Sequence, residues 1–249
     1  MAPERIFDRP HYRALDQARI MLLRKCLGEW KNQLGLGTAW DIGCGVGNFS
    51  TLLMELGFQT RALEGREDNA AEARKRNPGL HVNVADVEDP AIAEWGPSDL
   101  VLCFGLMYHL ENPFRAIRSL HRLTGKLIIV ESVCTGDEHP TLLLCQEETS
   151  EDQGLQNIAF YPSETCLIKM LYCSGFANVY RFVSLPDHKD FSIPPGAKKT
   201  RTILAATRFK FDSPHIEPAI EPSARYTPWA ANRVEGNPKL RRITRLFAK

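Results

Sequence analysis

The sequence predicts an α/β fold with a seven-stranded sheet and helices on both faces. Three observations lead to this prediction. Short apolar segments alternate with segments of helical pattern along most of the chain. Residues 99–104 form a continuous apolar run, which is typical of a strand buried on both faces. Residues 38–48 contain a strand, a tight glycine turn and the start of a helix, an arrangement that brings backbone amides close to a bound nucleotide.

The length of the chain, 249 residues, suits one α/β domain with additions. We expect residues 1–34 to form an N-terminal cap helix. Residues 35–208 should form the main domain, which carries a lid insertion at 134–161. Residues 209–249 should form a tail that is first rich in proline and then basic.

Charge and cysteine usage exclude several classes of protein. The formal net charge of +1 provides no global field that would recruit nucleic acid or a membrane. No run of about 18 apolar residues is present and the N-terminus lacks a signal-peptide core, so we expect no transmembrane helix and no membrane partner. Seven cysteines without a Cys-x-x-Cys pair indicate reduced thiols and a cytoplasmic protein. Cys134, His139 and Cys145 match no zinc spacing, so no metal site is predicted.

The glycine turn carries Gly43, Gly45 and Gly47 at alternate positions after Asp41. A dinucleotide site would have its third glycine at the position of Asn48. The Asp41 carboxylate would also repel a pyrophosphate, whereas it suits a cationic ligand. A nucleoside that carries an amino acid and a positive sulfur, S-adenosylmethionine, has the required charge.

The first half of the chain is expected to alternate helices with strands. A helix over 9–34 has one apolar and one polar face. The apolar face comprises Ile20, Leu22, Leu23 and Leu27, and the polar face Arg13, Arg19, Arg24 and Lys25. Further helices are predicted over 48–56, stopped by Gly57, and over 67–76, closed by Pro78 and Gly79. The first three strands are expected to begin at Thr38, to span 58–63 and to span 81–85.

The second half completes the predicted sheet. Asn112 is a favourable N-cap and Pro113 a favourable first residue for a helix to about residue 122. A further helix over 163–174 stops at Gly175. The remaining strands are expected over 99–104, 126–130, 176–183 and 202–206, with a loop rich in proline and lysine over 184–200. Four prolines predict that the segment 209–230 is irregular. The pattern of residues 237–249 predicts a short basic amphipathic segment.

The connector over 134–161 is long and acidic. It contains no lysine or arginine and six acids, namely Asp137, Glu138, Glu147, Glu148, Glu151 and Asp152. A long insertion over the ligand-binding edge of a sheet is typically a lid or a substrate wall. We expect its carboxylates to repel the phosphates of a nucleic acid.

Two stretches carry a family resemblance. The segment from Asp41 to Gly47 closely resembles the first motif of the class I S-adenosylmethionine-dependent methyltransferases, which implies a Rossmann-like seven-stranded sheet. Residues 98–183 are similar to the catalytic domain of the tRNA wobble-uridine carboxymethyltransferases. The similarity lies in Tyr108-His109-x-x-x-Pro113, in Tyr161-Pro162-Ser163 and in the helix end from Cys173 to Val179. Those enzymes pair a basic residue with the carboxylate of a modified cofactor, and the sequence alone places no counterpart here.

The predicted cofactor site follows the first three strands. Glu64 lies 23 positions after Asp41, where an acid accepts hydrogen bonds from ribose hydroxyls. The resemblance assigns the same role to Glu64, and it places Asp86 at the adenine amino group with Val87 against the ring. The full set of expected S-adenosylmethionine-binding residues is Asp41, Gly43, Cys44, Gly45, Gly47, Asn48, Glu64, Gly65, Arg66, Asp86, Val87, Phe104 and Gly105.

The predicted catalytic residues are Tyr108 and His109, in the loop after the fourth strand. Ligands bind at this carboxyl edge in open α/β sheets. His109 is the candidate general base, because an imidazole titrates near pH ~6.5. Its alternative role is a neutral histidine that orients the loop or closes the cofactor pocket. Tyr108 suits a wall or a hydrogen-bond donor, because a phenol with a pKa near ~10 is seldom ionised.

The leading functional hypothesis is a methyltransferase that acts on an oxygen or nitrogen of a small molecule. One alternative is an RNA-modifying enzyme of the tRNA wobble-uridine type, against which the acidic connector argues. The other is a non-catalytic subunit with this fold, against which the intact glycine turn and Glu64 argue. The sequence determines neither the acceptor nor the oligomeric state.

Overall fold

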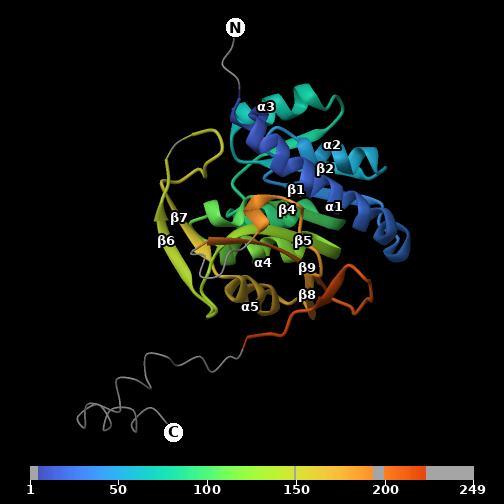
Figure 1. Cartoon of the computed structure of the whole chain (residues 1–249). Helices are drawn as coiled ribbons and strands as arrows, with labels where there is room; N and C mark the ends of the chain where they lie inside the picture. Colours follow the sequence, from blue (N-terminus) through green and yellow to red (C-terminus); the bar gives the residue numbers. More distant parts are fainter. Residues whose placement is uncertain (1–4, 149, 193–198, 223–249) are drawn as a thin grey trace, which may run out of the picture.

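The computed structural model describes residues 5–148, 150–192 and 199–222 (Figure 1). The strands are β1 (Thr38–Ile42), β2 (Gln59–Glu64), β3 (His81–Val84), β4 (Ser98–Phe104), β5 (Thr124–Thr135), β6 (Leu142–Gln146), β7 (Ile158–Pro162), β8 (Asn178–Phe182), β9 (Lys199–Thr207) and β10 (Ile216–Pro218). The α-helices are α1 (Pro10–Leu34), α2 (Asn48–Glu55), α3 (Glu67–Arg76), α4 (Pro113–Leu123) and α5 (Glu164–Ser174). Short 3-10 helices are η1 (Ile6–Asp8), η2 (Pro90–Trp95), η3 (Met107–His109) and η4 (Lys189–Phe191).

Within the described residues, eight strands form one sheet in the order β10-β8-β9-β5-β4-β1-β2-β3. The strands β1 to β5 pair in parallel, whereas β8, β9 and β10 join in antiparallel fashion beside β5. The α/β class and the helices on both faces are thus confirmed, but the predicted count of seven strands is one too low. The carboxyl ends of β1, β2 and β4 share one edge, which brings the predicted cofactor segments together.

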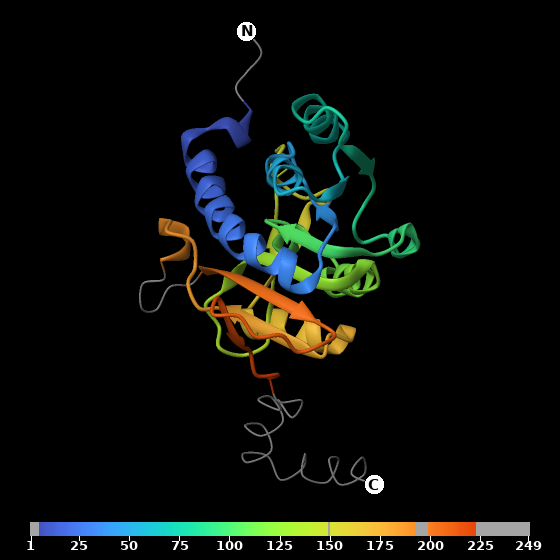
Figure 2. The ribbon, with the colours of Figure 1, turned by 90° about the vertical axis from the view of Figure 1, so that its right-hand side faces the viewer.

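The core has two layers, one on each face of the sheet. Leu100 and Leu102 of β4 pack with α1 and α2, while Val101 and Cys103 pack with α4 and α5 on the other face. Figure 2 shows α1 in blue along one side of the sheet. A strand buried on both faces has apolar side chains at consecutive positions, which is why 99–104 reads as an unbroken apolar run.

Helix α1 has the predicted position but a different polar face. It begins at Pro10 and ends at Leu34, and the C-cap residue Gly35 adopts the left-handed conformation with a φ of 59°. Leu23 and Leu27 are fully buried, as the apolar pattern predicts. Arg19, however, is 5% exposed rather than on a solvated face. The helical pattern assigned Arg19 to the polar face, because one of the acids that hold it, Glu131, lies 112 positions away in sequence. The other, Asp16, lies one turn back on the same helix.

The connector 134–161 contains a β-hairpin, β6 paired with β7, which stands beside the main sheet (Figure 1). Its strands are rich in leucine and aromatic residues, with Leu143 opposite Tyr161 and Leu144 opposite Phe160. The N–H of Phe160 donates to the carbonyl of Leu110 at 2.9 Å, which attaches the hairpin to the loop after β4. We call residues 136–162 the arm.

The segment after β9 differs from its prediction. Residues 209–230 were expected to be irregular, yet Ile216–Pro218 form β10 and pair with β8. Ile216 is buried and supplies the apolar contact, and an edge strand tolerates the missing N–H of Pro218. The basic segment 237–249 lies outside the described residues. Within the described ranges, no helix has both the length and the hydropathy that crossing a membrane requires.

Candidate functional site

The glycine turn between β1 and α2 is fastened to the end of β2. The N–H groups of Gly43 and Cys44 both donate to the carbonyl of Leu63, at 2.8 and 3.0 Å. Gly43, Gly45 and Gly47 have φ angles of 71°, 54° and 87°, a region that favours glycine. A Cβ at Gly47 would lie 2.5 Å from Asn77 Nδ2, so this glycine also permits close packing on α3.

Glu64 ends β2 and holds this turn in place. Its Oε2 accepts the N–H of Gly45 at 2.8 Å, and its Oε1 accepts the N–H of Arg66 at 3.0 Å. Burial raises the pKa of Glu64, while the N–H groups of Arg66 and Gly45 act in the opposite direction. A carboxylate oxygen has further lone pairs, so Glu64 retains acceptor capacity for ligand hydroxyls.

Asp41 lies beneath the turn and is 1% exposed. The hydroxyl of Ser50 donates to its Oδ2 at 2.6 Å. Burial raises the pKa of Asp41 to about 7, against the lowering effect of Ser50. Asp41 therefore supports the turn from below in this structure, and neither of the two cavities described next is lined by it.

Two adjoining cavities open at the carboxyl edge of the sheet. The larger has a volume of about 320 Å³ and lies between the glycine turn, α1, η3 and the arm. The smaller, about 50 Å³, lies between Glu64, the acidic turn after β3 and the arm. Gly43, Glu64, Arg66 and His109 line both. Of the predicted site residues, Cys44, Gly45, Asn48, Phe104, Gly105 and Tyr108 line the larger cavity, and Gly65, Asp86 and Val87 the smaller.

Gly47, like Asp41, lies outside both cavity walls and serves the turn itself. Gly65 has a different role from the glycines of the turn. A Cβ at Gly65 would lie 2.8 Å from Leu155 Cδ1, so its missing side chain makes room for the arm. Leu155 thereby forms the outer wall of the smaller cavity.

Sequence reasoning missed a buried ionic network at the floor of the larger cavity. Glu131 is fully buried within β5 and accepts from Arg19 Nη2 at 3.0 Å and from Arg201 Nη1 at 2.6 Å. The Asp16 carboxylate holds the same Arg19 at 3.1 Å. Burial acts to raise the pKa of Glu131, but the two guanidinium groups outweigh it and hold that pKa below its usual range. Two arginines and two acids therefore balance in charge.

No sequence signal identifies this network, because Arg19 and Arg201 lie 112 and 70 positions from Glu131. Cavity residues outside the predicted site set include Phe7, Tyr12, Asn69, Gln153 and Tyr161. They come from the N-terminal segment, α3 and the arm, and only the fold brings these segments together.

His109 forms a buried pair with Glu147 of the arm. Its Nδ1 lies 2.7 Å from Glu147 Oε1, and both side chains are less than a tenth exposed. Glu147 Oε2 accepts the N–H of Gly154 at 3.0 Å, which fixes the carboxylate. The second ring nitrogen of His109, Nε2, is left for a ligand or a proton. A histidine held at one nitrogen by a carboxylate is oriented for acid–base chemistry at the other.

Tyr108 packs against this pair. Its ring centroid lies 4.1 Å from that of His109 and 5.7 Å from that of Tyr161. Arg201 approaches its ring, with Cζ 5.5 Å from the centroid. Burial raises the pKa of the Tyr108 phenol, so it is neutral at physiological pH. Tyr108 is thus suited to a wall or a hydrogen-bond donor, as the sequence predicts.

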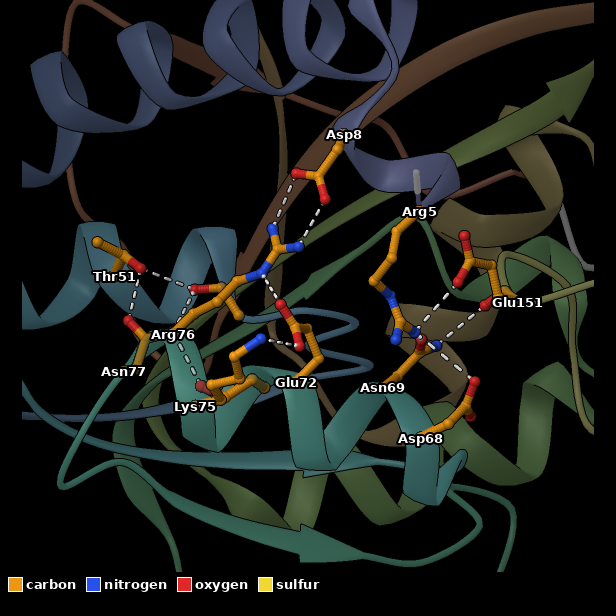
Figure 3. Close-up of polar contacts among 12 residues, drawn as sticks. Arg5, Asp8, Thr51, Asp68, Asn69, Glu72, Lys75, Arg76, Asn77 and Glu151 are labelled. Carbon is orange, nitrogen blue, oxygen red and sulfur yellow. Dashed lines mark hydrogen bonds and ion pairs between the residues drawn. The ribbon is translucent and has the colours of Figure 1, made fainter. Parts of the chain in front are cut away.

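The N-terminal segment and the arm close over the two cavities. Figure 3 shows Arg5 between Glu151 of the arm and α3, with Arg5 Nη2 at 3.1 Å from Glu151 Oε2 and 3.6 Å from Asp68 Oδ2. Asn69 Nδ2 donates to the Glu151 carbonyl at 2.9 Å. The Tyr12 hydroxyl also donates to Asp152.

These contacts change the interpretation of the acidic connector. Of its six acids, Glu147, Glu151 and Asp152 hold the arm to the rest of the molecule. Their charges are compensated or shared inside the structure rather than directed at an incoming ligand. The expected repulsion of phosphates therefore rests on Asp137, Glu138 and Glu148, which are exposed.

Comparison with known proteins matches residues 40–129 to the family described as a methyltransferase domain. A tRNA U34 carboxymethyltransferase from Mannheimia succiniciproducens is 34% identical over 87 residues, which are 34% of this chain and 26% of that protein. A ubiquinone biosynthesis O-methyltransferase from Xanthomonas oryzae pv. oryzae is 31% identical over 96 residues, which are 36% of this chain and 40% of that protein. The chain spans less than half the length of these relatives.

Among solved structures, the N-terminal domain of EvdMO1 with SAH bound has a TM-score of 0.62 and 20% identity, and the match covers 80% of this chain and 84% of that one. At this identity the likeness shows the fold. Together with the glycine turn, these findings give the conclusion that residues 40–129 match a methyltransferase domain, and that the described residues have the fold of the class I S-adenosylmethionine-dependent methyltransferases.

Proposed function

We propose that this chain transfers a methyl group from S-adenosylmethionine to an oxygen or nitrogen of a small molecule. The residues around the cavities fit this cofactor. The glycine turn presents backbone at the cavity wall, and Glu64 presents a buried carboxylate to both cavities. Asp86 and Val87 line the smaller cavity, where the resemblance places the adenine. When bound, S-adenosylmethionine supplies an activated methyl group on a positive sulfur.

The observation that carries the proposal is that His109 lines both cavities and is paired with the buried Glu147 behind it. In our proposal, His109 Nε2 takes the proton that an oxygen or nitrogen acceptor must lose. Glu147 holds Nδ1 and stabilises the imidazolium that results. The larger cavity, at about 320 Å³, lies at the lower end of the range for small-molecule sites. The arm excludes water from the reacting groups.

Two measurements test this function. Calorimetry should show binding of S-adenosylmethionine and S-adenosylhomocysteine but not of NAD. A screen with labelled methyl donor against phenols, carboxylates and amines should identify an acceptor. With that acceptor, His109→Ala should lower kcat by roughly 10²–10⁴-fold, while the exposed His81→Ala serves as control. Binding of NAD but not of S-adenosylhomocysteine would overturn the proposed cofactor. Full activity of His109→Ala would overturn the proposed role of His109 as the base.

A second candidate is modification of a tRNA wobble uridine, with a carboxymethylated cofactor. The similarity to tRNA U34 carboxymethyltransferases favours it, as do Arg19 and Arg201 at the cavity wall. Glu131 already engages both arginines, so an added carboxylate would compete with it. A carboxylated cofactor that binds more tightly than S-adenosylmethionine, with carboxymethyl transfer to tRNA, would favour this candidate over the first.

The seven cysteines are all unpaired, and five of them are buried. This state agrees with a reducing compartment. We therefore include the cytoplasm as the proposed location, which fractionation of cells with an antibody against the chain would test.

A further inference from the structure

Two histidines and one aspartate meet on the surface beside α1, apart from both cavities. His11 lies in the first turn of α1. His188 directly precedes η4, and Asp190 lies within it. One nitrogen of each imidazole and one oxygen of the carboxylate all lie within 4.8 Å of one another. None of the three lines either cavity described above. The cluster joins the N-terminal cap helix to a loop 177 positions later.

The carboxylate of Asp190 stands between the two rings. Its Oδ2 is 3.5 Å from His11 Nε2, and its Oδ1 is 3.8 Å from His188 Nδ1. The ring centroids are 5.5 Å apart, at an interplanar angle of 47°. Ligand atoms at ~2.0–2.1 Å from a tetrahedral metal are separated by about 3.3 Å. The two nitrogen–oxygen distances of Asp190, 3.5 and 3.8 Å, are close to that separation.

The donor set selects the class of metal. Two imidazoles and a carboxylate suit zinc, cobalt, nickel and ferrous iron, whereas calcium and magnesium prefer oxygen ligands alone. Three protein ligands leave a coordination position for water. The His11 side chain is 47% exposed and gives an ion direct access from solvent.

An ion pair without a metal satisfies the cluster less well. Two neighbouring imidazoles share one carboxylate. The backbone N–H of Asp190 donates to His188 Nδ1 at 3.2 Å, and a metal at this nitrogen would displace that contact.

We propose that His11, His188 and Asp190 form a site for a divalent transition metal that fastens the first turn of α1 to η4. A metal bound at this position would also affect the larger cavity. Tyr12, the next residue after His11, lines the larger cavity and donates to Asp152 of the arm. A metal at His11 thus fixes the turn of helix on which one attachment of the arm depends. The proposal does not rest on the methyltransferase function.

The test is metal binding by the full chain without an affinity tag. Calorimetry with Zn²⁺ should give one site that His11→Ala and His188→Ala each weaken by at least about tenfold. His215→Ala is the matched control, because His215 also pairs with an acid, Glu29 at 3.0 Å, but belongs to no cluster of three ligands among the described residues. Circular dichroism should show that all variants remain folded.

A second measurement separates this site from adventitious binding to thiols. Zn²⁺ should raise the Tm of the wild-type chain and of His215→Ala, but not that of the double variant His11→Ala, His188→Ala. Co²⁺ should give a visible absorption spectrum of nitrogen and oxygen ligation, which the double variant loses. Wild-type protein that binds no Zn²⁺, or a double variant that binds it with unchanged affinity, would overturn the proposal.

Discussion

Asp41 and Glu64 look alike in the sequence, as acids at the ends of neighbouring strands, but the fold gives them different roles. Glu64 faces both cavities, while Asp41 is enclosed under the glycine turn. Asp41 is the more deeply buried of the two, because the Ser50 hydroxyl and α2 cover it. We therefore expect the two carboxylates to control different properties.

For Glu64, the change to test is Glu64→Gln. Loss of the charged acceptor should weaken S-adenosylmethionine binding by roughly 1.5–3 kcal/mol, the value of hydrogen bonds to a charged group. Glu67→Gln is the matched control, since Glu67 opens α3 on the surface and is 69% exposed. Isothermal calorimetry gives both dissociation constants, and an unchanged value for Glu64→Gln would remove this residue from the cofactor site.

For Asp41, the property to measure is the pH dependence of folding. Its folded-state pKa is about 7, above the unfolded value of ~3.9. Between these values the folded state holds a proton that the unfolded state has lost. The contribution of Asp41 to the free energy of unfolding therefore falls as pH rises, by at most ~1.4 kcal/mol per pH unit.

Urea unfolding of Asp41→Asn between pH 5 and 7 should lack this contribution. Asp99→Asn is the control. Burial acts to raise the pKa of Asp99, but the N–H groups of Gly37 and Thr38 together with Lys126 outweigh it and lower that pKa. Asp99 therefore stabilises the fold above pH ~3.9 and loses that effect only in acid. If Asp41→Asn retains the wild-type slope, Asp41 is already ionised in the folded state.

At the scale of elements, the arm depends on a close contact at Gly154. A Cβ there would overlap the backbone oxygen of His109 and approach Glu147 Oε2 to 3.1 Å. Gly154→Ala should therefore displace the arm and separate Glu147 from His109. We expect faster proteolysis of 136–162 and a fall in kcat, with the secondary structure of the sheet retained.

Gly28→Ala provides the matched control for that substitution. Gly28 lies inside α1 and has no atom within 4 Å of a built Cβ. Alanine there should stabilise the chain by about 0.5–1 kcal/mol, because glycine weakens a helix interior. Thermal unfolding and limited proteolysis should thus distinguish the Gly154→Ala variant from the Gly28→Ala variant. Equal proteolysis rates for the two variants would show that the arm does not rely on Gly154.

At the scale of the whole molecule, Glu131 joins three elements that are distant in sequence. It lies within β5 and pairs with Arg19 of α1 and Arg201 of β9. The two arginine side chains are only 6% and 11% exposed, so water cannot replace the lost partner. Glu131→Gln should therefore lower the free energy of unfolding by about 3–5 kcal/mol.

Glu55→Gln is the control for this prediction, because its pair with Arg24 is about half exposed on both sides. A surface pair contributes roughly 0–1 kcal/mol, so the control should unfold near the wild-type midpoint. Chemical denaturation with matched m-values measures both. Equal stability of Glu131→Gln and wild type would mean that the two arginines find other partners.

The sequence by itself determined the α/β class, the order of the main strands and helices, and the glycine turn with Glu64 at its side. These features depend on local causes: residue periodicity, capping, and the conformational freedom of Gly43 and Gly45. The turn and an acid one strand later lie together in every parallel βαβ unit, because the strands are neighbours.

Only the tertiary structure decided the partners that meet across the chain. Glu147 joins His109 from 38 positions away, Arg201 joins Glu131 from 70, and His11 meets His188 from 177. Local patterns assigned Arg19 to a solvated face and the arm's acids to the substrate mouth. Such side chains acquire their roles from burial and from the charge opposite them, and neither quantity exists until the sheet has formed and the N-terminal segment and the arm have closed over its edge.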